Sequence, residues 1–227
     1  MNSDHLQVYV VGRFDGLVAT MFRNRGWRGT RDIAMADLVV FTGGADINPA
    51  IYNEPVSGAK YIDEQRDAEE MAVYKAALNW NIPMLGICRG AQLLNCMNGG
   101  SLWQDVNNHT ANHWIVDTRT DATAFVTSTH HQQMRINPKT GHMIAVAYNQ
   151  AVKGRKSLCT RKAGAGVTQI PHAGDVDPEV VWYADTSCLC FQPHPEYPGN
   201  TDTANYFWSL FEELFDFGQS QAQESAS

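Results

Sequence analysis

Two short stretches of the sequence carry residues that could act together as a nucleophile and its base. Cys88 lies in Gly86-Ile87-Cys88-Arg89-Gly90, directly after a short apolar run and directly before a helix-forming stretch. Gly-x-Cys-x-Gly at such a junction is the cysteine counterpart of the serine nucleophile elbow, in which a sharp strand-to-helix turn lifts the nucleophile out of the sheet. The partial positive charge at the start of the helix favours a thiolate. The backbone N–H of Arg89 would then point at the space where an oxyanion forms.

The second stretch supplies a base. His194 follows the apolar run 187–192, and Glu196 comes two residues later. A histidine at the end of a strand, with a carboxylate beside it, gives a general base and the group that orients it. Prolines on both sides of the histidine stiffen the loop. The sequence therefore predicts acyl transfer with Cys88, His194 and Glu196 as the catalytic residues.

Four further histidines form two groups. His109 and His113 are four residues apart, a spacing at which one helix face could hold a metal ion. Nothing in the neighbouring sequence stands out as a third ligand, so we expect no metal site and no cofactor. His130 and His131 are contiguous, and we expect them to line a polar pocket.

Length and composition indicate one globular domain. The chain has 227 residues, of which 44% are apolar and 18% charged, enough for a full hydrophobic core in one α/β domain. We expect this domain to span residues 1–217. Residues 218–227 are small and polar, which predicts a disordered tail.

The net charge limits the kinds of partner that we expect, and the number and spacing of the cysteines indicate the cellular compartment. The formal net charge of −7 argues against nucleic acid or an anionic membrane as the main partner. No apolar run approaches the roughly 18 residues that a membrane span requires, and the N-terminus does not resemble a signal peptide. Five cysteines without a Cys-x-x-Cys pair are typical of a reducing compartment. We therefore expect a cytoplasmic protein without a structural zinc site.

Alternating apolar runs and helical patterns position the two catalytic stretches. We expect strands at 6–11, 37–42, 82–87 and 187–192, and helices at 17–25, 63–80, 91–97 and 202–217. The glycine-rich loop after 37–42 lies at the carboxyl end of a strand, where ligands bind in open α/β sheets. It either presents N–H groups to a ligand or forms a plain tight turn. The acidic first turns of 63–80 suit the helix dipole and are predicted to be a solvated face.

The pattern changes between residues 107 and 180. Short β-like pieces alternate with polar turns, which predicts a small β-rich excursion. Residues 152–177 form an unusually basic and glycine-rich insert within it.

Taken together, the motifs resemble the class I glutamine amidotransferase superfamily. More narrowly, they are similar to its γ-glutamyl-γ-aminobutyrate hydrolase branch, peptidase family C26. The resemblance rests on the following stretches: Gly86-Ile87-Cys88-Arg89-Gly90-x-Gln92, Gly99-Gly100-Ser101-Leu102-x-Gln104-Asp105, His130-His131-Gln132, Gln192-x-His194-Pro195-Glu196, Thr42-Gly43-Gly44-x-Asp46 and Arg66-Asp67-x-x-Glu70.

The resemblance implies a fold and roles for particular residues. The fold would be a flavodoxin-like three-layer sandwich with a mainly parallel central sheet. The nucleophile, base and orienting carboxylate would be Cys88, His194 and Glu196. The backbone N–H groups of Gly44 and Arg89 would form the oxyanion hole. The residues that hold the substrate would be Gln92, His130, His131 and Gln132.

Three functions remain open at this stage. The first is a hydrolase that cleaves a small γ-glutamyl compound through a thioester and releases glutamate and an amine. The second is the glutaminase subunit of an amidotransferase, which would pass ammonia to a separate synthetase. The third is a binding module that has the fold without the chemistry. The leaving amine and the oligomeric state, including a homodimer, stay undetermined.

Overall fold

The computed structural model describes residues 5–12, 15–148, 161–163, 167–169 and 176–217. Four α-helices lie in this part of the chain: α1 (Asp15–Arg23), α2 (Glu64–Asn79), α3 (Arg89–Met97) and α4 (Thr201–Leu214). Short 3-10 turns occur at Ile33–Met35, Pro49–Tyr52 and Ala184–Thr186. None of these helices has the length and apolar character needed to cross a membrane. The predicted tail 218–227 and most of the 152–177 insert lie outside the described residues.

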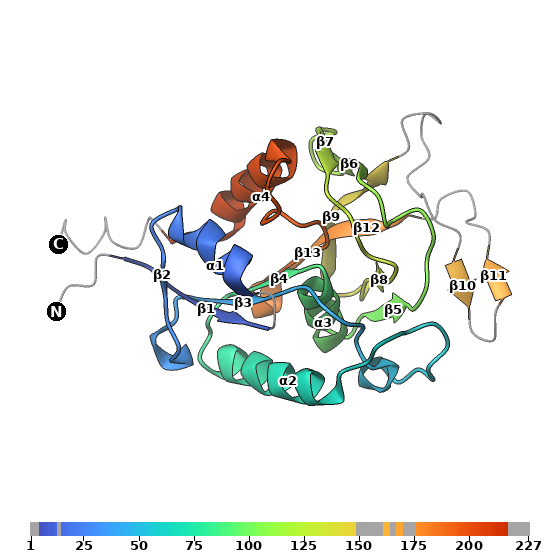
Figure 1. Ribbon diagram of the computed structural model, residues 1–227, viewed down its shortest axis with the longest axis horizontal. Coiled ribbons are helices and arrows are strands. Elements are labelled where there is room, and N and C mark those ends of the chain that lie inside the picture. Colours follow the sequence, from blue (N-terminus) through green and yellow to red (C-terminus); the bar gives the residue numbers. More distant parts are fainter. Residues whose placement is uncertain (1–4, 13–14, 149–160, 164–166, 170–175, 218–227) are drawn as a thin grey trace.

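A nine-stranded sheet forms the centre of this part of the chain (Figure 1). Its order from edge to edge is β2 (Arg28–Gly29), β1 (Gln7–Val11), β3 (Leu38–Phe41), β4 (Met84–Ile87), β13 (Cys188–Phe191), β12 (Pro178–Tyr183), β9 (Gly141–Tyr148), β6 (His113–Asp117) and β7 (Thr123–Val126). Two further pairs lie outside it: β5 (Ser101–Trp103) with β8 (Gln133–Arg135), and β10 (Arg161–Ala163) with β11 (Val167–Gln169).

The sheet has a parallel part and an antiparallel part. The strands β2, β1, β3, β4 and β13 are parallel in the order 2-1-3-4-5, which is the flavodoxin-like order. The predicted fold class is therefore confirmed. The β-rich segment is less separate than its sequence suggested, because β12, β9, β6 and β7 extend the same sheet by antiparallel pairing.

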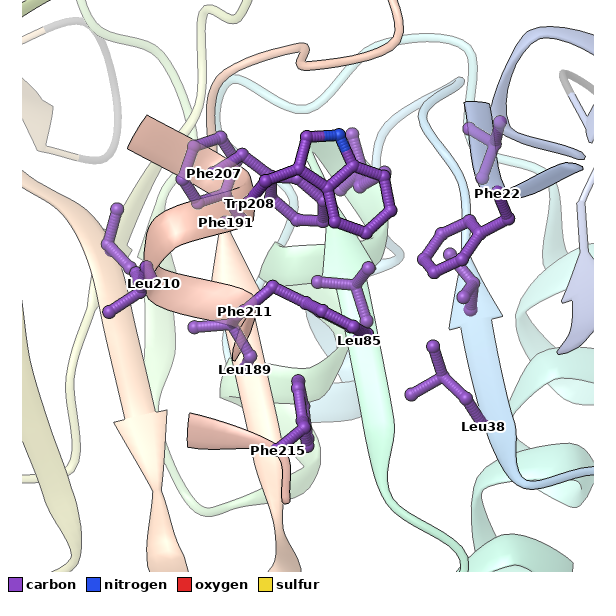
Figure 2. Packing of buried hydrophobic residues seen from close by; sticks show 14 of the residues in the cluster. Phe22, Leu38, Leu85, Leu189, Phe191, Phe207, Trp208, Leu210, Phe211 and Phe215 are labelled. Atoms are coloured by element: carbon purple, nitrogen blue, oxygen red, sulfur yellow. The ribbon is translucent and has the colours of Figure 1, made fainter. Parts of the chain in front are cut away.

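Helices cover both faces of the parallel part and make three layers (Figure 1). On one face, α1 and α4 bury an aromatic cluster, because Phe207, Leu210 and Phe211 recur at helical spacing along α4. Figure 2 shows these side chains packed with Phe22 against Leu85 of β4. On the other face, α2 and α3 contribute a second apolar cluster. The layers fix the carboxyl ends of β3, β4 and β13, where the candidate site lies.

Candidate active site

Cys88 is the single residue that connects a strand to the following helix. Strand β4 ends at Ile87, α3 begins at Arg89, and Cys88 between them has φ 52° and ψ −109°. A positive φ is uncommon for a residue with a Cβ atom and costs about 1–3 kcal/mol, so the surrounding structure must hold the turn in place. Part of that hold is the Cys88 N–H, which donates to the carbonyl of Phe191 at 3.0 Å.

The two glycines around Cys88 allow the helix to approach the strands. A Cβ atom on Gly86 would overlap the backbone of Gly90, and one on Gly90 would overlap the carbonyl of Phe41. Neither backbone can move without moving β3 or α3. This close approach is the physical reason for glycine on both sides of the cysteine.

His194 lies in the loop after β13 and is fixed through both ring nitrogens. Its Nδ1 is 2.7 Å from Oε1 of Glu196, and its Nε2 is 3.0 Å from the hydroxyl of Thr129. The ring of Tyr197 stacks on the imidazole with centroids 4.3 Å apart. Thr127 holds the backbone of His194 through two hydrogen bonds. Its hydroxyl accepts from the His194 N–H at 3.2 Å and donates to the His194 carbonyl at 2.7 Å.

The electrostatics of this histidine favour its charged form. Burial alone would lower the pKa of His194, but the charge of Cys88 and hydrogen bonds to Cys88 and Glu196 outweigh that effect and raise the pKa to about 11. With Cys88 ionised, the ring is therefore an imidazolium beside the sulfur. Such a pair combines a nucleophile with a proton donor for a leaving group.

The glycine-rich loop after β3 lies against these two residues. A Cβ atom on Gly43 would be 3.2 Å from Cε1 of His194 and 3.7 Å from Cβ of Cys88. Gly44 has φ 152°, and a Cβ there would overlap Nη1 of Arg66. Arg66 supports the turn through hydrogen bonds, since its Nη2 donates to the carbonyls of Thr42 at 3.1 Å and Gly43 at 3.0 Å.

A buried network of four charges joins this loop to the elbow. Arg89 donates from Nη1 to Glu70 and from Nη2 to Asp67, and Arg66 donates from Nε to Glu70 at 2.6 Å. All four side chains are at most 5% exposed. The predicted solvated face of α2 is therefore wrong for Arg66, Asp67 and Glu70, because their charges pair with one another and with Arg89 instead of with water.

The predicted residues surround one cavity of about 580 Å³. Its walls include Cys88, His194, Glu196 and Gly44, together with all four residues suggested for substrate binding, Gln92, His130, His131 and Gln132. The side-chain amide of Gln92 is held by two hydrogen bonds, since its Nε2 lies 3.2 Å from both the carbonyl of Gln132 and Oε1 of Gln192. Arg89 directs its side chain into the charge network and is not among the residues that line the cavity, so its predicted contribution is the backbone N–H alone. That backbone N–H lies in the first turn of α3, where an intrahelical acceptor is lacking.

The two adjacent histidines differ in their surroundings. His131 is 28% exposed, and its Nε2 and Nδ1 lie 3.0 Å from Asp46 and 3.4 Å from Asp105. The hydrogen bond to Asp46 raises the pKa of His131 above its ordinary value, although burial opposes this. His130 is buried, and burial lowers its pKa. Its Nδ1 lies 2.8 Å from the carbonyl of Gln132, and its Nε2 lies 3.5 Å from Oε1 of Glu179.

Several residues around the site were given no role from the sequence. Thr129 and Tyr197 touch His194, and Asp46 binds both His131 and the N–H of Lys60 at 2.6 Å. The contacts of Thr129 with His194 and of Asp46 with His131 join segments far apart in the chain, which a local pattern does not reveal. His109 and His113 do not share a helix face, because His113 opens β6 and His109 lies in the preceding loop.

Comparison with known proteins places the chain in a family. The family model described as Peptidase C26 matches residues 8–196. The glutamine amidotransferase-like protein YvdE of Lactococcus lactis subsp. lactis is 33% identical over 171 residues, which are 75% of this chain and 70% of the relative.

Solved structures agree with the fold. A glutamine amidotransferase from Thermotoga maritima matches 92% of this chain and 83% of its own, with a TM-score of 0.57 and 17% identity. A protein from Thermoplasma acidophilum, described as a GMP synthase subunit, matches the whole of both chains, with a TM-score of 0.62 and 16% identity. At these identities the structures establish the fold alone. The match to the family model, over most of the chain, establishes that this protein belongs to the peptidase C26 family.

Proposed function

We propose that the protein is a hydrolase that cleaves the γ-glutamyl amide bond of small γ-glutamyl compounds and releases glutamate and an amine. Membership of the peptidase C26 family indicates a cysteine hydrolase acting on amides. The observation that carries the proposal is the meeting of Cys88 on its elbow, the His194–Glu196 pair and the Gly43–Gly44 turn in one cavity.

The first half of the proposed reaction forms a thioester. The Cys88 thiolate attacks the carbonyl carbon of the γ-amide, and the tetrahedral oxyanion faces the N–H groups of Gly44 and Arg89. Each such donor is worth roughly 3 kcal/mol in comparable sites. The His194 imidazolium gives its proton to the leaving nitrogen as the C–N bond breaks, and the free amine departs.

The second half releases glutamate. His194, now neutral, takes a proton from a water molecule, and the resulting hydroxide attacks the thioester carbonyl at the same oxyanion hole. The C–S bond then breaks and the sulfur leaves as thiolate. Glu196 stays ionised throughout and stabilises the imidazolium each time it forms.

The charges on the cavity wall favour an amino acid substrate. A γ-glutamyl group carries an α-carboxylate and an α-ammonium in addition to the bond that is cut. Asp46 and the imidazole of His131 offer one partner for each charge, and the cavity volume of about 580 Å³ suits a small ligand. Gln92 and Gln132 add amide groups. In this arrangement His130 acts through its neighbours, because both of its nitrogens face protein groups.

A second candidate is the glutaminase subunit of an amidotransferase. The fold is shared with a protein described as a GMP synthase subunit, which favours a separate synthetase partner for this chain as well. Free glutamine would then be the substrate, and activity would rise when the partner binds. A catalytically inactive binding module is disfavoured, because it has no use for a strained cysteine beside a charged histidine.

The test is glutamate release by the purified protein from glutamine and from a panel of γ-glutamyl amines. We expect release from the amines, with Cys88→Ala inactive and Cys96→Ala active. Cys96 is a buried cysteine on α3, the helix that follows Cys88, and is a matched control for loss of a thiol. Turnover by Cys88→Ala would refute the mechanism. Release from glutamine alone would establish the glutaminase function instead.

A further inference from the structure

Three imidazole nitrogens converge on one carboxylate oxygen beneath the wall of the cavity. Nδ1 of His109, Nε2 of His113 and Nε2 of His130 lie 3.2, 3.3 and 3.5 Å from Oε1 of Glu179. The four residues come from the loop before β6, the start of β6, the loop before β8 and strand β12. All four are buried, and the side chain of Glu179 is fully enclosed.

In each histidine the other ring nitrogen faces a group that can only accept a hydrogen bond. Nδ1 of His113 lies 3.1 Å from the carbonyl of Ala111, and Nδ1 of His130 lies 2.8 Å from the carbonyl of Gln132. Nε2 of His109 lies 3.3 Å from the carboxylate of Asp177. A neutral ring held this way donates from that nitrogen and turns a lone pair toward Glu179. This is the arrangement of histidines that ligate a metal, whose second nitrogen donates to a carbonyl or carboxylate.

The spacing of the four atoms matches a tetrahedral ion. Zinc binds nitrogen and oxygen at about 2.0–2.1 Å, so two ligands of a tetrahedral site are about 3.3–3.4 Å apart. The three distances to Glu179 fall close to that value. The ligand atoms of His109, His113 and Glu179 all lie within 4.8 Å of one another. Within the described part of the chain, neither oxygen of Glu179 nor Nε2 of His113 or His130 makes a hydrogen bond. Lone pairs facing a buried carboxylate repel it, and a cation between them removes the repulsion.

We propose that His109, His113, His130 and Glu179 bind one Zn²⁺ ion. Four protein ligands and complete burial are typical of a structural site, in which the ion contributes to folding and takes no part in the reaction. The ion would tie β6 and β12 to the loop before β8. That loop carries Thr129, which contacts His194, and His131 on the cavity wall. The proposed zinc site is independent of the proposed hydrolase function, and metal binding alone tests it.

The test begins with the full chain, purified, stripped with a chelator and titrated with zinc(II). We expect one equivalent of zinc to remain after gel filtration, measured by elemental analysis. Cobalt(II) in its place should give the intense visible bands of a four-coordinate ion. At a free zinc concentration about 100-fold above Kd, the melting temperature should rise by about 5–10 °C. Retention of less than a tenth of an equivalent, with no change in melting temperature, would overturn the proposal.

Variants locate the ion. Glu179→Gln keeps the shape of the side chain, and we expect it and His113→Asn to weaken zinc binding at least 100-fold. His142→Asn replaces an exposed histidine of β9 and should bind as the wild type does. Because Cys88 and His194 could themselves capture zinc, the titration is repeated with Cys88→Ala, which should still bind one equivalent. Loss of binding in Cys88→Ala, or wild-type affinity in Glu179→Gln, would place the ion elsewhere and refute the site. Cys88→Ala keeps all four proposed ligands, so its stoichiometry still tests the site where Glu179→Gln or His113→Asn fails to fold.

Discussion

Replacing Glu70 by glutamine tests whether the buried charges of α2 hold the active site together. Glu70 accepts from Arg66 through Oε1 and from Arg89 through Oε2, and its side chain is 1% exposed. With Asp67, the network has two positive and two negative charges. The substitution leaves one buried positive charge without a counterion, and it turns an amide N–H₂ toward a guanidinium.

The expected cost follows from these contacts. A hydrogen bond between charged groups contributes about 1.5–3 kcal/mol, and removing one partner of a buried ion pair costs about 3–5 kcal/mol. Glutamine retains one acceptor oxygen, so the lower end applies, and we expect the free energy of unfolding to fall by about 3 kcal/mol. The matched control is Glu69→Gln, the same substitution one residue earlier on the exposed side of α2, where the loss should stay within about 0.5 kcal/mol.

The measurement is urea unfolding of both variants and the wild type, together with kcat on the best substrate found. Because Arg66 also holds the carbonyls of Thr42 and Gly43, displacement of its guanidinium should loosen the Gly44 turn and lower kcat in the variant that is still folded. If the free energies of unfolding of Glu70→Gln and Glu69→Gln differ by less than about 1 kcal/mol, the network does not carry the role assigned to it.

Three other substitutions test separate parts of the site and core. Gly44→Ala puts a Cβ onto Nη1 of Arg66, and we expect kcat to fall by about 10²–10³-fold because the predicted oxyanion hole is displaced. The control is Gly16→Ala, where a Cβ meets nothing within 4 Å, and its steady-state kinetics should be unchanged. Glu196→Gln removes a group that helps raise the pKa of His194 to about 11. The reaction needs the imidazolium and is lost above that pKa, so the alkaline limb of the kcat/KM profile should move to lower pH, and an unmoved limb would contradict the assigned partner. Phe211→Ala opens the aromatic cluster under α4 and should cost about 3–5 kcal/mol in denaturant unfolding, well above Leu78→Ala on the surface of α2.

Local patterns were sufficient to predict the elements that hold the candidate catalytic residues. The elbow at Cys88 follows from an apolar run, two glycines and a helical stretch close together in the chain, and β4 and α3 lie where that pattern puts them. The strands between 107 and 180 could be located but not placed, because β9 pairs with β12 and with β6, which are distant from it in the sequence. Sequence periodicity carries no information on such pairings.

Buried polar clusters were missed for the same reason. Arg66, Asp67 and Glu70 have the composition of a solvated helix face, and only Arg89, on another helix, makes their burial favourable. His109 and His113 gave a pair without a third ligand, because Glu179 lies 66 residues beyond His113 and is brought there by β12. In both cases the sequence shows the residue types. It does not show which distant residue pairs with them in the folded chain.

Helix α2 therefore acts as a positioning element although none of its residues lines the described cavity. The two predicted oxyanion donors belong to different segments, Gly44 after β3 and Arg89 at the start of α3. Arg66 holds the carbonyl side of the first segment, Arg89 belongs to the second, and Glu70 binds both guanidinium groups. One carboxylate thus joins the two segments that carry the predicted donors. The strained turn at Cys88 lies between these segments, so we expect the buried ion pairs of α2 to support the proposed chemistry at the end of β4.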